Sequence, residues 1–298
     1  MREKELIVYK EFSGEEGKLL YDMAWLMTHY REEAKRKKAT LLCYSCMHRL
    51  FEMAENHGFY GNLWHCYLSN LLVNNENGYS RACEIRGEVG GTINRAVLHD
   101  IVIFKEFFDF DFSEMARALN LEALDLITGY EGSDSESKVY NSRIRDRICR
   151  LAVKFTKDHM PEEMKDTLTE FYRDYGVGKF GLHKAFRVVH GDGGVEIVPI
   201  RNIAHVHLDD LVGYEIPKKK LVENTLAFVE GRKANNCLLF GDAGTGKSSS
   251  IKGIANEYYE KGLRIIEMYK HQFQDLNEVI TQIKNRNYKF IIYMDDLS

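Results

Sequence analysis

A glycine-rich segment toward the C-terminal end carries the clearest chemical signal in the sequence. It reads Gly241-Asp-Ala-Gly-Thr-Gly-Lys-Ser248, which matches the phosphate-loop pattern G-x-x-x-x-G-K-[ST] at every fixed position. Glycines allow backbone angles that are closed to bulkier residues, so successive N–H groups can converge on phosphate oxygens. The sequence therefore predicts a nucleotide-binding site.

The loop leaves an apolar segment and enters a helix, as phosphate binding requires, because the positive end of the helix then faces the anion. We expect Lys247 to reach the β- and γ-phosphates and the Ser248 hydroxyl to ligate Mg²⁺. The residues expected to contact the nucleotide are Gly241, Asp242, Ala243, Gly244, Thr245, Gly246, Lys247, Ser248 and Ser249.

A second signal is the apolar run 290–294, which ends in Asp295 and Asp296. Such a run fits a buried parallel strand that delivers carboxylates to its C-terminal edge. When no phosphate loop precedes it, an apolar run that ends in two aspartates usually marks a strand that enters a polar turn. Downstream of a phosphate loop, it predicts that Asp295 helps to hold Mg²⁺ and that Asp296 polarises the attacking water.

The elements around these motifs predict a parallel sheet with right-handed crossovers, because strands and helices alternate. The expected strands are 237–240, 263–268 and 290–294, and the expected helices are 218–230, 247–260 and 273–284. The fold class is thus an α/β P-loop fold with a parallel sheet.

The rest of the chain predicts a mainly α-helical N-terminal domain that ends in a short β-hairpin. Apolar residues recur at helical spacing over 17–36, 39–55, 63–73, 93–108, 138–157 and 162–175. Two β-rich runs flank Gly191-Asp-Gly-Gly194 and indicate a hairpin at about 185–200. We place the domain boundary near residue 205, which gives domains 1–204 and 205–298.

The whole pattern resembles the AAA+ ATPases. The segment Leu211-Val-Gly-Tyr-Glu-Ile-Pro-Lys is similar to their box II, and the resemblance implies that the backbone near Val212 and Gly213 contacts adenine. From Leu211 to Ser298 the chain is most similar to an uncharacterised bacterial AAA+ family of unknown function. The helical region resembles that family's N-terminal part less specifically, through Trp64-His-Cys-Tyr-Leu and Asn75-Glu-Asn.

The chain departs from the AAA+ pattern in two respects. It has Asp-Asp where these proteins commonly have Asp-Glu, and an aspartate reaches less far toward a water. It also stops at Ser298, before the sensor strand, the fifth strand, the arginine finger and the helical lid that the resemblance implies, so the resemblance implies a parallel sheet that is incomplete at the C-terminus. We therefore expect a piece of a longer protein, with little or no turnover by itself.

The resemblance implies a Mg²⁺-dependent ATPase that binds ATP and ADP and couples hydrolysis to action on a macromolecular partner. The N-terminal domain would grip a protein or nucleic acid, and the complete protein would form a homo-oligomer. Two alternatives remain open. One is a non-enzymatic, nucleotide-gated adaptor, and the other is a P-loop kinase for a small molecule, against which box II argues.

The composition of the chain excludes several classes of protein. With 44% apolar and 29% charged residues and a net charge of −4, the chain is a globular protein rather than a generally basic nucleic-acid binder. No apolar run is long enough for a membrane span or a secretory signal, so we expect a cytoplasmic protein. The six cysteines are then most simply reduced thiols.

Three other clusters have weaker functional interpretations. Cys43 and Cys46 form a C-x-x-C pair, but their helical apolar context favours core cysteines over a metal or redox site. The basic run 31–38 is typical of a solvated helix face, with a contact to phosphate or an acidic partner as the alternative. The run 143–150 places arginines on a helix that also has an apolar side, and a partner or nucleic-acid surface is the alternative there. His205-Val-His207 precedes two aspartates, yet a connecting segment is the simpler interpretation.

Overall fold

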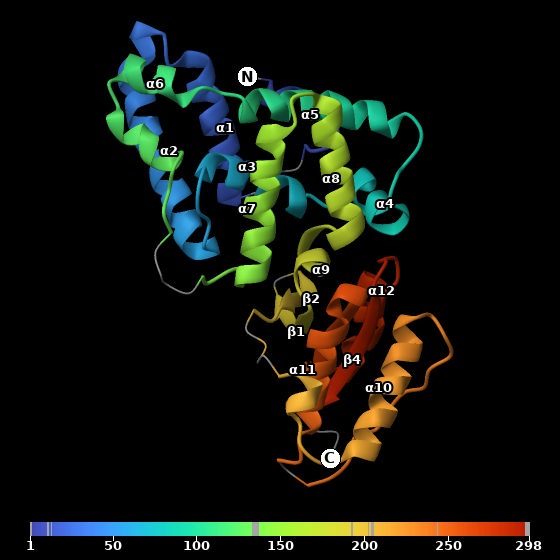
Figure 1. The fold of residues 1–298 in the computed structure, drawn as a ribbon. Helices are drawn as coiled ribbons and strands as arrows, with labels where there is room; N and C mark the ends of the chain where they lie inside the picture. The colour runs from blue at the N-terminus through green and yellow to red at the C-terminus, as the bar shows by residue number, and fades with distance from the viewer. Residues whose placement is uncertain are drawn as a thin grey trace. The chain divides into compact units, whose positions relative to one another are not determined.

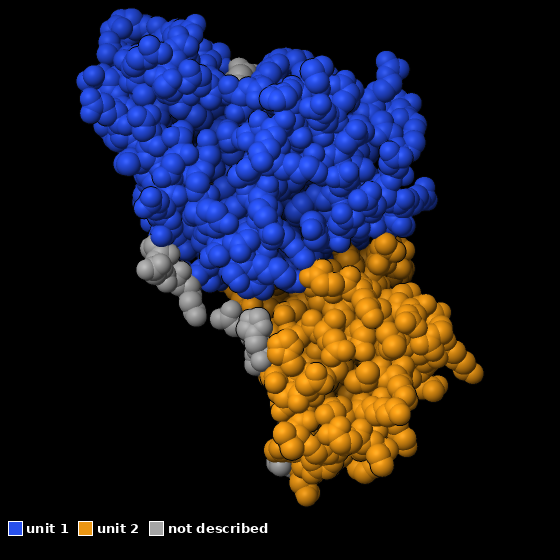
Figure 2. Space-filling view, in the orientation of Figure 1, with its two compact units in different colours: residues 1–182 blue, residues 183–298 orange. Residues whose placement is uncertain are grey.

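The computed structural model of the 298-residue chain describes residues 2–10, 12, 14–132, 137–191, 193–201, 203, 206–242 and 244–295. It divides into two compact units, Met1–Leu182 (unit 1) and His183–Ser298 (unit 2), which are coloured separately in Figure 2. In the described part of the chain, no helix combines the length and the apolar composition that crossing a membrane would require.

Unit 1 is built of helices, as the apolar spacing predicted (Figure 1). Three of its helices were not among the predicted segments: Gly78–Arg86, Phe112–Leu119 and Gly178–Leu182. Pro161 occupies the first turn of its helix, where its missing N–H is tolerated. The elements are η1 (Glu3–Glu5), α1 (Gly14–His29), η2 (Glu33–Lys35), α2 (Arg36–His57), α3 (Leu63–Asn74), α4 (Gly78–Arg86), α5 (Ile93–Phe108), α6 (Phe112–Leu119), η3 (Glu122–Ile127), α7 (Ser142–Lys157), α8 (Pro161–Tyr175) and α9 (Gly178–Leu182).

The core of unit 1 is rich in aromatic side chains. Trp64 on α3 is fully buried, and its indole N–H donates to the carbonyl oxygen of Phe107 at 2.9 Å. Its ring lies 5.3 Å from the ring of Tyr67 and 6.3 Å from the ring of Phe112, measured between centroids. Aromatic packing of this kind adds to the free energy gained by burying the rings.

A buried carboxylate ties the N-terminal segment of the chain to α5. The side chain of Asp100 is fully buried. It accepts hydrogen bonds from the backbone N–H groups of Ile7, Val8 and Tyr9 at 2.7–3.1 Å. His99 lies 3.0 Å from the same carboxylate. A buried charge of this kind is tolerated because several donors share it.

The cysteines are distributed unevenly between core and surface. Five of the six are buried, and Cys237 alone is exposed. Cys43 and Cys46 lie on the inner side of α2, where burial raises the pKa of the Cys43 thiol to about 11 and that of the Cys46 thiol to about 12. The structure therefore places this C-x-x-C pair in the core, as the helical context favoured.

Unit 2 has a four-stranded sheet in the order β2-β1-β3-β4 (Figure 1). Strands β1, β3 and β4 are parallel, and β2 pairs with β1 in the antiparallel sense. The elements are β1 (Ala185–Gly191), β2 (Gly194–Pro199), η4 (Leu208–Asp210), α10 (Glu215–Val229), α11 (Lys247–Tyr258), η5 (Tyr259–Lys261), β3 (Leu263–Tyr269), η6 (Lys270–Asp275), α12 (Leu276–Ile283) and β4 (Lys289–Asp295).

The helical part followed by an α/β part is the predicted fold class, but the sheet is mixed rather than purely parallel. The predicted hairpin at 185–200 is present, and its strand β1 pairs with β3, with Phe186 opposite Ile266. The hairpin therefore belongs to the sheet of unit 2, and the units divide at Leu182 and His183 instead of near residue 205.

The strand predicted at 237–240 is wrong. Residues 234–241 form no strand, and no described strand pairs with them. Leu238 is 72% exposed and Phe240 is 88% exposed, although both are apolar. An extended apolar segment becomes a strand only when a neighbouring strand satisfies its backbone groups, and among the described residues this segment has no such neighbour.

A buried arginine braces the start of β3. Arg264 is buried between the rings of Tyr259 and Tyr288, at 4.0 and 4.3 Å from their centroids. It also donates to the carbonyl oxygens of Tyr259 and Leu263, at 3.0 and 2.9 Å. Cation–π contacts with the two rings and hydrogen bonds to the two carbonyl oxygens stabilise the buried guanidinium group.

We expect Arg264→Met to lower the free energy of unfolding of unit 2 by about 2 kcal/mol, because methionine keeps the apolar length of the side chain but loses the cation–π and carbonyl contacts. Urea denaturation followed by circular dichroism measures the change. The exposed Arg232, which pairs with Glu230, provides the control Arg232→Met. Equal effects of the two variants would contradict a special role for Arg264.

Candidate functional site

The phosphate-loop motif lies between the extended segment 234–240 and the start of α11. Its glycines have the backbone angles that the motif needs, since φ is 144° at Gly241, 79° at Gly244 and 82° at Gly246. A Cβ atom at Gly244 or Gly246 would meet nothing within 4 Å. Glycine is therefore favoured at these two positions by backbone angle rather than by lack of space.

The backbone N–H groups of this segment are available to an anion. Within the described residues, those of Gly244, Gly246, Lys247 and Ser248 have no hydrogen-bond acceptor, whereas the N–H of Ser250 already donates to the carbonyl oxygen of Gly246 at 2.8 Å. The first N–H groups of a helix have no acceptor inside the helix, and they carry its positive end. The loop and the first turn of α11 thus present together several donors that no described residue accepts from. Ala243 lies outside the described residues.

Lys247 lies over the start of the loop. Its Nζ donates to the carbonyl oxygens of Gly241 and Asp242, at 2.8 Å in both cases. Thr245 closes the same turn through its Oγ1, which donates to the carbonyl oxygen of Asp242 at 2.8 Å. An ammonium group has three protons, so one of them is left for a phosphate oxygen.

Ser248 is connected to the sheet through a residue that the motifs did not single out. Its Oγ lies 3.1 Å from the hydroxyl oxygen of Tyr293 on β4. In the sequence, Tyr293 is part of the apolar run 290–294, where a tyrosine is ordinary strand material. The available signal was its position, two residues before Asp295, because alternate residues of a strand share a face.

The predicted acidic residues lie at the end of β4. Asp295 is the last residue of the strand, and its backbone is opposite Tyr269 of β3. The side chain of Asp295 and the whole of Asp296 lie outside the described residues. Their expected roles toward Mg²⁺ and water therefore stay predictions.

The turn that was expected to contact adenine precedes α10. Val212 is 95% exposed, and Gly213 has a φ of 89°. Among the described residues, no hydrogen bond or ring contact joins this turn to the phosphate loop. Ser249 lies in the first turn of α11 with Ser248. The structure thus brings together the loop, Lys247 and Ser248, and the expected contact of Val212 and Gly213 with adenine stays a prediction.

The two histidines near residue 205 lie in a segment that we interpreted as a connection, and the structure describes only His207 of the two. The backbone N–H of His207 donates to the carboxylate of Asp210 at 2.9 Å, and this contact closes the turn η4. His205 lies outside the described residues. No group of three histidine, cysteine or acidic side chains in the described residues is arranged to hold a metal ion.

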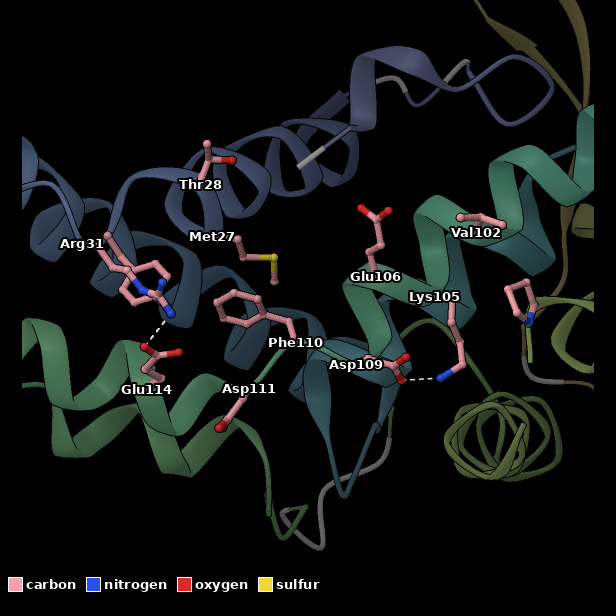
Figure 3. A pocket seen from close by; sticks show the side chains of 12 residues that line it. Met27, Thr28, Arg31, Val102, Lys105, Glu106, Asp109, Phe110, Asp111 and Glu114 are labelled. Atoms are coloured by element: carbon pink, nitrogen blue, oxygen red, sulfur yellow. Dashed lines mark hydrogen bonds and ion pairs between the residues drawn. The ribbon is translucent and has the colours of Figure 1, made fainter. Parts of the chain in front are cut away.

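A hollow of about 700 Å³ lies in unit 1 and carries no part of the phosphate loop. Figure 3 shows two ion pairs in its wall, from Arg31 to Glu114 and from Lys105 to Asp109. These pairs neutralise much of the charge that a ligand would otherwise meet. The lining residues are Met27, Thr28, Tyr30, Arg31, Val102, Lys105, Glu106, Asp109, Phe110, Asp111, Glu114 and Pro161.

The comparison with known families finds a match in the α/β part of the chain. Residues 181–298 match the family described as a protein of unknown function (DUF815). The DUF815 match begins near the boundary between the two compact units and runs from β1 through β4. It therefore includes the hairpin as well as the phosphate loop, and it agrees with the observed division better than with a boundary near residue 205.

The DUF815 match covers less than half of the chain, and the helical unit 1 lies almost wholly outside it. No curated protein and no solved structure matches the chain.

Proposed function

We propose that the DUF815 part of this chain binds ATP and ADP with Mg²⁺ and is the nucleotide-binding part of an AAA+-type ATPase. The single observation that carries the proposal is the set of N–H groups at Gly244, Gly246, Lys247 and Ser248 that have no acceptor among the described residues, which left-handed glycines and a helix start present together. The DUF815 match is consistent with a P-loop ATPase.

The residues of the loop fit a metal–nucleotide ligand. The Ser248 hydroxyl has a lone pair beyond its contact with Tyr293, and Lys247 has a proton beyond its two carbonyl contacts. Hydroxyl, carboxylate and phosphate oxygens are the ligands that Mg²⁺ prefers. When bound, Mg²⁺ would neutralise charge on the β- and γ-phosphates.

In the proposed mechanism, the loop N–H groups hold the β-phosphate and Lys247 contacts the γ-phosphate. Ser248 and Asp295 would hold the metal ion. Asp296 would orient the water that attacks the γ-phosphorus while the bond from this phosphorus to the β–γ bridging oxygen breaks, so that ADP leaves and inorganic phosphate forms. We further propose that unit 1 binds a protein or nucleic-acid partner and that the complete protein acts as a homo-oligomer. The nucleotide-gated adaptor is the alternative, and it differs by binding ATP without turnover.

Thermal unfolding of the chain with Mg·ATP, Mg·ADP and no nucleotide tests the proposal. A ligand at a hundred times its dissociation constant adds about 2.7 kcal/mol to the unfolding free energy of the part that binds it, which raises Tm measurably. We expect this shift in the parent and its loss in Lys247→Ala. Lys252→Ala is the matched control, because Lys252 lies on the same helix but outside the loop.

Either of two results would contradict the proposed function. The first is the absence of a shift in the parent at millimolar nucleotide, and the second is an equal shift in the parent and in Lys247→Ala. Release of inorganic phosphate from ATP then separates an ATPase from the adaptor.

A further inference from the structure

A pair of hydroxyl groups joins the helix of the phosphate loop to the neighbouring strand. Ser248 Oγ at the start of α11 and Tyr293 Oη on β4 lie 3.1 Å apart. The ring of Tyr293 packs against a small core that includes Ile251 and Ala255 of α11 and Ile291 of β4. The tyrosine hydroxyl is thus held beside Ser248 by apolar contacts of the same helix and strand.

The sheet changes from apolar to polar at the position of Tyr293. One row across the three parallel strands consists of Ala185, Ile265 and Ile291, and the next row toward their carboxyl ends consists of Arg187, Glu267 and Tyr293. Because alternate residues share a face, both rows lie on the face that packs against α11. Tyr293 therefore lies where the apolar face of the sheet ends, and its hydroxyl is on the polar side, beside Ser248 of the phosphate loop.

The pairing leaves Ser248 able to act as a metal ligand. A serine hydroxyl has one proton and two lone pairs, and a bond to Tyr293 uses only one of these three. Hydrogen bonds from outside the first coordination shell commonly orient metal ligands and raise metal affinity. An acceptor for the serine proton would fix the direction of the lone pairs.

We propose that Tyr293 is a positioning residue for Mg²⁺: its hydroxyl oxygen accepts the proton of Ser248 and turns a lone pair of Ser248 Oγ toward the metal ion of a bound Mg·nucleotide. This inference rests on the proposed function of the loop. It assigns to Tyr293 an effect on the part of nucleotide affinity that depends on Mg²⁺, and no effect on the part that the loop N–H groups and Lys247 supply.

The test measures the dissociation constant of a fluorescent N-methylanthraniloyl derivative of ATP, in excess Mg²⁺ and in EDTA, for the full chain and for Tyr293→Phe. The ratio of the two constants is the gain that Mg²⁺ provides. We expect Tyr293→Phe to reduce this gain about three- to tenfold, the range of one hydrogen bond, and to leave the affinity in EDTA unchanged.

Three further variants isolate the hydroxyl pair. Ser248→Ala is expected to remove most of the gain from Mg²⁺, and Tyr293→Phe should have no further effect in that background, because the two hydroxyls act as one unit. Tyr288→Phe, just before β4, removes a phenol hydroxyl outside the pair and should keep the gain of the parent.

The outcomes separate this inference from the proposed function. An equal loss of affinity with Mg²⁺ and in EDTA would make Tyr293 a purely structural residue and overturn the inference. A larger gain from Mg²⁺ in Tyr293→Phe would show that Tyr293 holds Ser248 away from the metal, which also overturns it. If the parent binds no nucleotide, both proposals fail; if it binds with an unchanged gain in Tyr293→Phe, only the role of Tyr293 fails.

Discussion

Replacement of Asp100 by alanine is expected to lower the free energy of unfolding of unit 1 by about 4 kcal/mol. The carboxylate is fully buried and accepts the backbone N–H groups of Ile7, Val8 and Tyr9. Alanine would leave these donors without their acceptor, at about 1–3 kcal/mol for each donor that stays buried. Chemical denaturation followed by circular dichroism measures the loss.

Two further variants sharpen this prediction. Asp100→Asn keeps the shape of the side chain but has one acceptor oxygen instead of two, so an intermediate loss is expected. Asp125→Ala is the surface control and should change the free energy of unfolding by less than about 0.5 kcal/mol. An Asp100→Ala variant as stable as this control would show that the hydrogen bonds from the N-terminal segment to Asp100 add nothing to the stability of unit 1.

The second large effect is expected at Trp64. Trp64→Ala should lower the free energy of unfolding of unit 1 by about 4 kcal/mol, because it opens a large cavity among Tyr67, Phe107 and Phe112 and removes the hydrogen bond to the Phe107 carbonyl. Trp64→Phe refills part of the space and loses the donor, so a loss of about 2 kcal/mol is expected. Denaturation in urea measures both.

The other tryptophan provides the matched control. Trp25 is only half-buried, and its ring is covered by the ammonium group of Lys38 at 4.4 Å from the centroid. Trp25→Ala should therefore cost less than half as much as Trp64→Ala. If the two variants lose equal stability, the aromatic cluster around Trp64 is not the main support of the core. Neither change touches the phosphate loop, so the stabilisation by Mg·ATP should persist in both.

The structural features that could be predicted from the sequence are those that depend on residues close together in the chain. The phosphate loop and the start of α11 could be predicted from the sequence. Gly244 and Gly246 have positive φ angles that favour glycine, and the helix begins at the residue after Gly246. Most helices of unit 1 follow from apolar spacing within single segments, whereas the shorter α4, α6 and α9 were missed. Each of these features depends on residues close together in the chain.

Features that depend on distant partners were missed. The segment 237–240 has strand composition, but strand formation needs a neighbour that the segment itself does not specify. The two β-rich runs around the glycine-rich turn predicted a hairpin, but they did not show that Phe186 lies opposite Ile266 of another strand. Asp100 lies within a helical pattern, where an aspartate is normally exposed, and its burial depends on Ile7, Val8 and Tyr9, far away in the sequence.

The same reasoning explains what could be learned of the candidate site. Lys247 and Ser248 lie within a contiguous motif, so their proximity follows from the local chain. Tyr293 comes beside Ser248 only because β4 and α11 pack against each other around Ile291 and Ile251. The position of Tyr293 two residues before Asp295 indicated which face of the strand it shares, but the contact with Ser248 on another element could not be predicted from the sequence alone.

The uneven burial of the cysteines makes the chain convenient for site-specific labelling. Cys237 is the one exposed thiol of six, and it lies four residues before Gly241, the first residue of the phosphate loop. A maleimide dye should react there first, because the other five thiols are shielded in the core of unit 1. A fluorophore beside the loop can therefore be installed on the unmodified sequence, without prior removal of any other cysteine.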